Sequence, residues 1–471
     1  MIFNKYIEYF FSLPSFVICL LFIFTVEQVV AREGYSSTDN ADIFNSTEIR
    51  LTERQALVLA KAYAQHGQRN DAISLYQKLI NAAHGQEIKN EAAFQLAGIY
   101  MLEEEFRKAI SLYIQILNRQ PDLPRVRLEL ARAYFLNQEY EDAQLQFELV
   151  KGSNLSPAVL EKIDIYLTLI RRKKDWNFDF SMALVPDSNI NQASGGKEEC
   201  IALGNILLCR PLEEEKKSIG FEIGGTFTNY LHFNRDLSLY NIIMVNALEY
   251  EQGTFDDYQF FIATGPRYTF ENGEISIQPT FRKRWYAGNQ YNEEYGIQLN
   301  TQTVLNRFIL NNGLSYSKNV YNDSYIDSVL NGNTTIFNTQ LRYIINDRTF
   351  IQAGVTYQKD NTKIKSYGSD GWRYGLGIYR VLPYGFSFFS ELSLNDLKYH
   401  DSQLYITEDY HISETTRKDR IVQFFLYISS SMFEKYNIIP SLQYLYTKST
   451  SNIWTHEYSR QRLNLFFNYR F

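Results

Sequence analysis

The chain has 471 residues, 15% of them aromatic, and a formal net charge of −6 at neutral pH. This length exceeds that of one small domain, and the negative charge gives no reason to expect nucleic acid as a partner. Beyond the first 31 residues no apolar run reaches about 18 residues, which excludes a transmembrane helix there. The many Tyr and Phe residues suit the aromatic girdles of a membrane barrel.

The amino terminus has the order of a secretory signal. Lys5 precedes an apolar run over 10–26, and small residues follow that run. Cys19 falls inside this segment and not in a lipobox-like setting. We therefore expect a signal peptide over 1–31 and a linker over 32–51.

A repeated helical pattern occupies residues 52–174. The spaced apolar, aromatic and small residues between Leu96 and Leu117 are matched by similar residues 34 positions later. Only Lys151, which corresponds to Leu117, is of a different type. This period is that of tetratricopeptide repeats, whose stacks leave a concave groove for peptides or proteins. Small residues let paired helices approach and aromatic residues fill the space between pairs, and the predicted packing residues are Tyr63, Ala72, Tyr76, Tyr100, Ala109, Tyr113, Tyr134, Ala143 and Phe147.

A last helix begins at Ser156 and Pro157, a good N-cap followed by Pro at the first helical position. It ends in the basic run 171–174, whose cations suit the helix dipole and need no ligand. This helix is predicted to cap the stack and to lead directly into the next domain.

From Trp176 onward the hydrophobic period becomes two, which is typical of strands. About fourteen strand-like segments are predicted, at 176–185, 217–230, 237–250, 257–270, 274–287, 293–304, 307–319, 334–345, 349–360, 371–380, 385–397, 418–430, 436–448 and 459–471.

The connections fall into two classes. Those at 271–273, 346–348 and 381–384 are short, whereas the odd-numbered segments precede the long ones, 186–216 and 398–417 among them. A transmembrane β-barrel requires this alternation. The predicted fold is thus α + β: periplasmic tetratricopeptide repeats, then a barrel of about 14 antiparallel strands over 175–471.

The final segment presents Leu465, Phe467, Tyr469 and Phe471 on one face and mainly polar residues on the other. Closing strands of outer-membrane barrels look like this, and in that class the barrel-assembly machinery reads the closing strand. An ordinary amphipathic edge strand is the alternative.

After signal removal two cysteines remain, Cys200 and Cys209, within one predicted loop. In an oxidising compartment their spacing favours a disulfide. No histidine lies nearby, so a metal site is not predicted, and no cofactor is expected.

Several barrel residues are candidates for contact with a passenger. Arg282 and Arg284 are predicted to face the lumen, where they either hold an anionic client or form internal salt bridges. Lys283 points the other way beside Trp285, where lipopolysaccharide phosphates are a plausible partner. A polar turn with Asp187, Asn189 and Asn191 either lines the lumen or only shapes the first outer loop.

The architecture and the junction residues resemble the Slam family, the surface lipoprotein assembly modulators of type XI secretion. The closest likeness is in 178–181 (Phe-Asp-Phe-Ser) and 186–193 (Pro-Asp-Ser-Asn-Ile-Asn-Gln-Ala). The resemblance implies a monomeric Gram-negative outer-membrane translocator that exports a client, a surface lipoprotein or a secreted haem- or iron-binding protein. The repeats would meet the client or its periplasmic chaperone.

Three other functions remain open. Polysaccharide export porins also join repeats to a barrel, but they tend to have longer arrays and about sixteen strands. An outer-membrane enzyme would need a Ser/His or Asp/His arrangement at the rim. The consecutive residues His400, Asp401 and Ser402 cannot form a relay by themselves, so we predict that the chain is not an enzyme. A passive porin with a docking module is the third.

Overall fold

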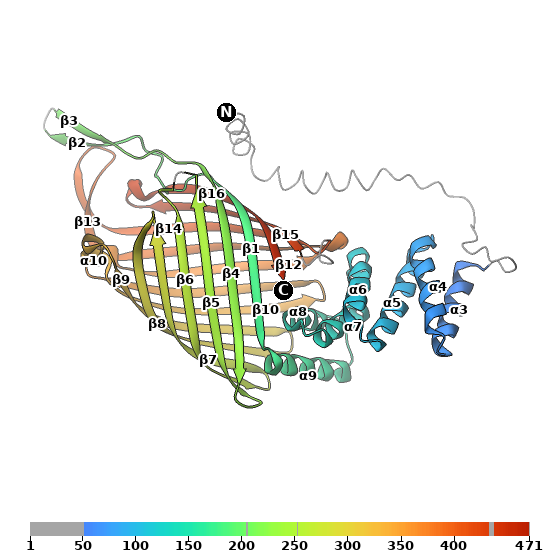
Figure 1. The fold of residues 1–471 in the computed structure, drawn as a ribbon. Coiled ribbons are helices and arrows are strands. Elements are labelled where there is room, and N and C mark those ends of the chain that lie inside the picture. Colours follow the sequence, from blue (N-terminus) through green and yellow to red (C-terminus); the bar gives the residue numbers. More distant parts are fainter. Residues whose placement is uncertain (1–50, 204–205, 252, 433–437, 471) are drawn as a thin grey trace. The chain divides into compact units, whose positions relative to one another are not determined.

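The chain divides into two compact units, Met1–Lys89 and Asn90–Phe471. The predicted signal peptide and nearly all of the predicted linker lie outside the described residues. No helix in the described part of the chain has the length and apolar character needed to cross a membrane. The computed structural model describes residues 51–203, 206–251, 253–432 and 438–470 (Figure 1).

The first unit contains the helix pair α3 (Glu53–Gln65) and α4 (Arg69–Ala82). A capping box starts α3: the Thr52 hydroxyl accepts from the backbone N–H of Gln55, and the Gln55 side chain accepts from the backbone N–H of Thr52. Small residues are fully buried in both helices, so the pair can pack closely; they are Ala56, Ala60 and Ala72.

The helices that follow end in the second unit. Aromatic rings fill the space between them: the ring centroids of Phe94 and Tyr113 are 5.8 Å apart, and Phe147 stacks on Tyr166 at 4.9 Å. The helices are α5 (Gln86–Leu102), α6 (Phe106–Arg119), α7 (Pro124–Leu136), α8 (Tyr140–Val150) and α9 (Pro157–Lys173).

Fourteen strands of the second unit form one closed antiparallel barrel, in which β1 pairs with β16. Its strands are β1 (Trp176–Asp187), β4 (Ser218–His232), β5 (Leu237–Tyr250), β6 (Asp257–Phe270), β7 (Gly273–Tyr286), β8 (Asn289–Leu305), β9 (Phe308–Tyr321), β10 (Gly332–Asn346), β11 (Thr349–Thr362), β12 (Ser369–Val381), β13 (Phe386–Ile406), β14 (Ile412–Ser430), β15 (Ile438–Ser451) and β16 (Tyr458–Arg470). The predicted fold class is confirmed.

The long connections contain structure that the sequence did not predict. The first holds a hairpin of β2 (Glu198–Leu203) and β3 (Ile206–Pro211), and another holds the short helix α10 (Ser324–Leu330). The predicted loop 398–417 is wrong in part, because β13 and β14 pair from Ser402–Thr416 to Ile406–Ile412. This part of the hairpin carries no regular alternation, since it continues beyond the apolar band of the barrel.

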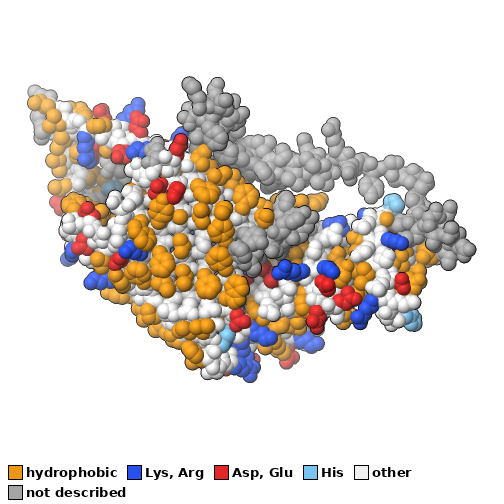
Figure 2. Space-filling view, in the orientation of Figure 1, with side chains coloured by type: hydrophobic (Ala, Val, Ile, Leu, Met, Phe, Trp, Pro, Cys, Tyr) orange, Lys and Arg blue, Asp and Glu red, His pale blue; other side chains and the backbone are white. Residues whose placement is uncertain are grey.

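The side chains of the barrel alternate between two environments. Along β7, Ile275 and Ile277 are exposed, whereas Ser276 and Gln278 are buried. The exposed set forms the apolar outer surface, and Figure 2 shows hydrophobic side chains spread over the barrel strands. The buried, largely polar set faces the lumen, as expected for a transmembrane barrel.

Candidate functional site

The barrel has two different ends, which we name by their connections. The short-turn mouth carries the connections after β4, β6, β8, β10, β12 and β14, and the loop mouth carries the others. The hairpin β2–β3 and helix α10 lie at the loop mouth, away from α8 and α9 (Figure 1). The helices α7, α8 and α9 contact the short-turn mouth.

A leucine of α8 enters the short-turn mouth. Leu149 is 1% exposed and packs in one cluster with Val304, Ile309, Ile344 and Phe350. These four barrel residues face the lumen, because their outward neighbours are exposed, among them Leu305, Phe308, Ile345 and Ile351. An apolar side chain of the repeat domain thus fills part of the lumen entrance.

Charged pairs surround this apolar contact. Glu148 of α8 lies 3.5 Å from Arg342 of β10, and Arg172 of α9 lies 2.8 Å from Asp236 in the turn after β4. Both carboxylate–guanidinium pairs join a helix to the barrel. They orient the helices on the mouth more than they stabilise them, since desolvation offsets much of the attraction in such pairs.

Arg127 of α7 is 2% exposed and lies 3.9 Å from Asp347, in the turn after β10. Its guanidinium donates hydrogen bonds to Gln146 (2.6 Å) and to the carbonyl of Pro121 (2.8 Å). The long separation leaves Asp347 only partly compensated: burial raises the pKa of this carboxyl, although Arg127 and Arg348 act to lower it. Burial likewise lowers the pKa of Arg127.

The basic end of α9 binds the barrel, a role that the sequence did not indicate. Arg171 and Thr168 both donate to the carbonyl oxygen of Glu271, in the turn after β6. In return, Arg267 of β6 donates to the carbonyl oxygen of Arg171 at 2.9 Å. The helix dipole accounts for cations in the last turn of α9, but the same cations also dock the helix on the barrel.

The lumen wall is rich in amide side chains that bond to one another. Gln298 donates to Gln278 at 2.9 Å, and Gln302 donates to Asn311 at 3.0 Å. A third amide, Gln352, donates to the carboxylate of Glu391 at 3.2 Å. Amides both donate and accept hydrogen bonds without carrying charge. This wall can therefore exchange hydrogen bonds with a passing chain and hold it only weakly.

The predicted lumen arginines are already partnered. Arg284 donates from Nε and Nη2 to the two oxygens of Asp257, at 2.9 and 2.8 Å, and Arg282 lies 3.7 Å from Glu294. The two arginines therefore form internal salt bridges, which is one of the two roles that the sequence left open for them. On the outward face, Lys283 pairs with Glu293 at 2.9 Å.

The polar turn after β1 closes the barrel seam at the loop mouth. Asp187 is fully buried and binds Arg460 of β16, with Nε 3.0 Å from both oxygens, and it accepts from the Tyr250 hydroxyl at 3.2 Å. Asn189 donates to the carbonyl of Ser459 at 3.0 Å. Asn191 accepts from the backbone N–H of Lys216 at 3.0 Å. These contacts fit the structural role for the turn.

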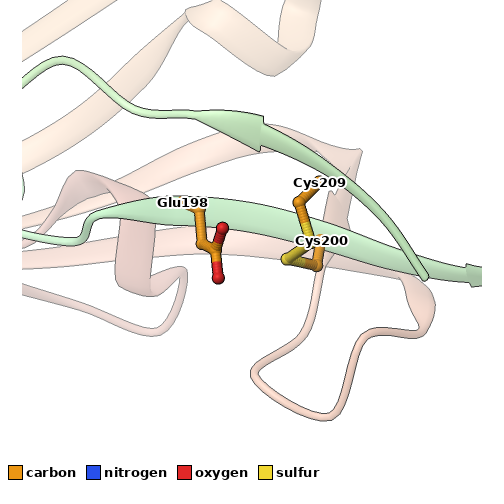
Figure 3. A group of neighbouring side chains, drawn as sticks. All are labelled: Glu198, Cys200 and Cys209. Atoms are coloured by element: carbon orange, nitrogen blue, oxygen red, sulfur yellow. A yellow bond between two sulfur atoms is a disulfide. The ribbon is translucent and has the colours of Figure 1, made fainter.

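Cys200 and Cys209 sit opposite one another in the hairpin β2–β3 and are joined by a disulfide. Figure 3 shows Glu198 beside them on the same hairpin. These three side chains are close enough together to hold a metal ion. A disulfide removes both thiolates, however, so the oxidised hairpin lacks the ligands that zinc prefers.

The remaining candidates belong to β13 and to the closing strand β16. His400 binds Asp370 at 2.8 Å, and the Ser402 hydroxyl binds Glu414, so the triplet has separate partners. Leu465 and Phe467 are exposed on the outward face of β16. Tyr469 pairs with Phe180 of β1 through its backbone, and Phe471 lies outside the described residues.

The docking residues Glu148, Leu149 and Asp347 were not predicted. One unusual residue in the sequence lies close to Glu148 and Leu149. Lys151, the single mismatch between the last two repeats, directly follows α8. Its ammonium group is buried against Asp164 of α9 at 2.6 Å, where the matching unit has an apolar residue. The mismatch therefore occurs in the repeat whose helix α8 contacts the barrel.

Comparison with known proteins places these features in one family. The sequence profile described as "Surface lipoprotein assembly modifier" matches residues 176–471, and the profile of that family's N-terminal TPR repeats matches 86–147. Surface lipoprotein assembly modifier 1 of Haemophilus influenzae is 23% identical over 76% of this chain and 73% of its own length. A surface lipoprotein assembly modifier of Pasteurella multocida is 24% identical, over 78% and 74%.

Proposed function

Because the chain belongs to the surface lipoprotein assembly modifier family, we propose that its barrel moves a client protein across the outer membrane to the cell surface. The barrel lies in the outer membrane and the repeats in the periplasm. The client we propose is a surface lipoprotein or a secreted haem- or iron-binding protein. The repeats engage this client or its chaperone.

The contact between Leu149 and the lumen entrance carries this proposal. It joins the protein-binding repeats to the opening of the channel, so a client bound by the repeats is held at the point of entry. Entry at this point requires α8 to move, because Leu149 packs on residues that face the lumen. Client binding and opening of the channel are then one coupled event.

The lumen wall supports a polypeptide as the passenger. Hydrogen-bonded amides such as Gln278 and Gln298 offer partners to an exposed backbone, and the pairs of Arg282 and Arg284 keep strong charges neutralised. A chain that interacts weakly along its path can leave as easily as it enters. Because no nucleotide is present in the periplasm, folding or docking of the client outside the cell supplies the direction of transport.

The test measures surface exposure of a lipoprotein encoded beside this chain. Both are expressed in a Gram-negative host, and intact cells are probed with antibody and protease. We expect client on the surface only when the chain is present. Equal exposure without the chain would overturn the proposal for that client and favour the alternative of polysaccharide export.

A matched pair of variants tests the route. Gly354 of β11 faces the lumen, and a side chain there has open space, with Thr339 O at 3.8 Å as the nearest atom. Gly354→Trp narrows the lumen and should lower surface client severalfold. Leu376→Trp adds the same ring on the outward face, where Leu376 is 70% exposed, and should change nothing. Wild-type export by the Gly354 variant would exclude the lumen as the route.

A further inference from the structure

We propose that the outward face of β12, β13 and β14 at the loop mouth binds the phosphate groups of an outer-leaflet glycolipid. The proposed site is a depression of about 640 Å³ whose lining includes Trp372, Asp396, Lys398, Lys418 and Arg420. We call it the rim groove. This inference is independent of the proposed transport function.

The rim groove lies on the membrane-facing side of the barrel. Every second side chain of β14 points outward. Along this outward face the side chains change from apolar to basic toward the loop mouth. Trp372 is 44% exposed on β12, and it lies in register with Asp396 of β13 and Arg420 of β14, at the level where the change occurs. Aromatic side chains mark the boundary between hydrocarbon and head groups. The face of β14 reads Ile428, Leu426, Phe424, Val422, Arg420 and Lys418.

Two lysines oppose one another within the groove. Lys398 of β13 and Lys418 of β14 are cross-strand partners, and both are exposed. Side chains at such positions lie about 5 Å apart at Cβ, and like charges there are destabilising. Lys448 of β15 follows on the same face, opposite Val422. An anion between these ammonium groups would remove the repulsion.

The nearby carboxylates have hydrogen-bonding partners of their own. Asp396 lies 2.7 Å from Nε of Arg420, and Asp370 lies 2.8 Å from Nε2 of His400. Among the described residues, no ion pair involves Lys398 or Lys418. Lys283 differs, because Glu293 neutralises it at 2.9 Å. Asp370 is the cross-strand partner of Lys398 on β12, so this lysine faces one carboxylate. The outward cations Lys398, Lys418, Arg420 and Lys448 still outnumber the outward carboxylates Asp370 and Asp396 at the level of the outer-leaflet head groups.

The ligand class follows from this chemistry. Lysines bind phosphate as point charges, and an outward site beside Trp372 also gives acyl chains an apolar surface to lie on. A phosphorylated glycolipid satisfies both requirements in one molecule. Free inorganic phosphate shares the charge but not the apolar contact.

The test uses the purified full chain in detergent, with diphosphoryl lipid A as the probe and native mass spectrometry as the readout. Lys398→Gln with Lys418→Gln should weaken binding about 30-fold, since each lysine near a lipid head group contributes about 1 kcal/mol. Lys398→Arg with Lys418→Arg keeps the charge and should bind as the wild type does. Lys283→Gln is the matched control and should change affinity less than twofold.

Two outcomes would overturn the proposal. Wild-type affinity in the double Gln variant would show that the lipid binds elsewhere. Displacement of lipid A by inorganic phosphate at millimolar concentration would identify a site for free phosphate instead. Heat-modifiable gel migration checks that each variant has a folded barrel, and the double Arg variant separates loss of charge from loss of fold.

Discussion

Glu148 of α8 and Arg342 of β10 face one another at the short-turn mouth, with carboxylate and guanidinium atoms 3.5 Å apart. Arg342 also lies over the ring of Phe350, 4.4 Å from its centroid. Phe350 in turn belongs to the cluster that receives Leu149. One helix therefore contacts the entrance with an apolar centre and a charged rim.

Leu149→Ala should open the entrance without unfolding the barrel. Removing a buried leucine side chain costs roughly 2–5 kcal/mol, and here that loss falls on the contact between α8 and the lumen wall. We expect a higher single-channel conductance in planar bilayers. Leu136→Ala is the control, because Leu136 is 43% exposed on α7. Equal conductance of the Leu149 variant and the wild type would contradict a closing role for α8.

Docking of α7 should depend on pH through Asp347. The pKa of this carboxyl is raised by burial in the docked state, so the docked state holds the proton more tightly than the undocked state. Docking is therefore strongest below the ordinary pKa of an aspartate and weakens as the pH rises through the raised pKa of Asp347. Asp347→Asn should strengthen docking at neutral pH and remove this dependence.

Hydrogen exchange of the α7 amides measures the effect of Asp347. Protection in the wild type should rise on acidification from neutral pH, and the Asn variant should show no such change. Glu129→Gln serves as the control, because Glu129 is a carboxylate of α7 that pairs with Arg132 at 2.7 Å. A wild-type profile that falls on acidification would contradict the assigned sign.

The sequence predicts the barrel strands well because the alternation that identifies a strand is a local pattern of neighbouring residues. Along 275–285 each residue faces either lipid or lumen, and β7 alternates as expected at Ile275, Ser276, Ile277 and Gln278. Outside the membrane this constraint ends. The paired segments from Ser402 to Ile406 and from Ile412 to Thr416 do not alternate regularly between polar and apolar residues, so they have no hydrophobic period to detect.

The docking site could not be predicted, because it depends on residues that are remote in the sequence. Leu149 and Ile309 are ordinary apolar residues of a helix and a strand, and only the fold brings them together. Arg171 satisfied a local rule, the helix dipole, and that explanation concealed its bond to Glu271. Asp187 was recognised as a polar turn residue, but its partner Arg460 is 273 positions away.

Phe467→Ala should lower the amount of barrel in the outer membrane severalfold. Phe467 is 59% exposed on the outward face of the closing strand, where it contributes little to packing within the barrel. A loss of assembly would therefore point to reading of this strand by the assembly machinery. Leu376→Ala is the control, since Leu376 is 70% exposed on β12. Equal loss in both variants, measured in membrane fractions, would assign the effect to lipid contact instead.

Asp187→Asn should weaken the seam between β1 and β16. Asp187 is fully buried, and its loss of charge leaves Arg460 without its carboxylate partner. Breaking a buried pair by removing one partner costs roughly 3–5 kcal/mol. We expect a lower urea midpoint and faster proteolysis at the loop mouth. Glu391→Gln is the matched lumen control, because its partner Arg373 is 46% exposed and such a pair contributes at most about 1 kcal/mol. If both variants unfold at the same urea concentration, the Asp187–Arg460 pair is not what closes the barrel.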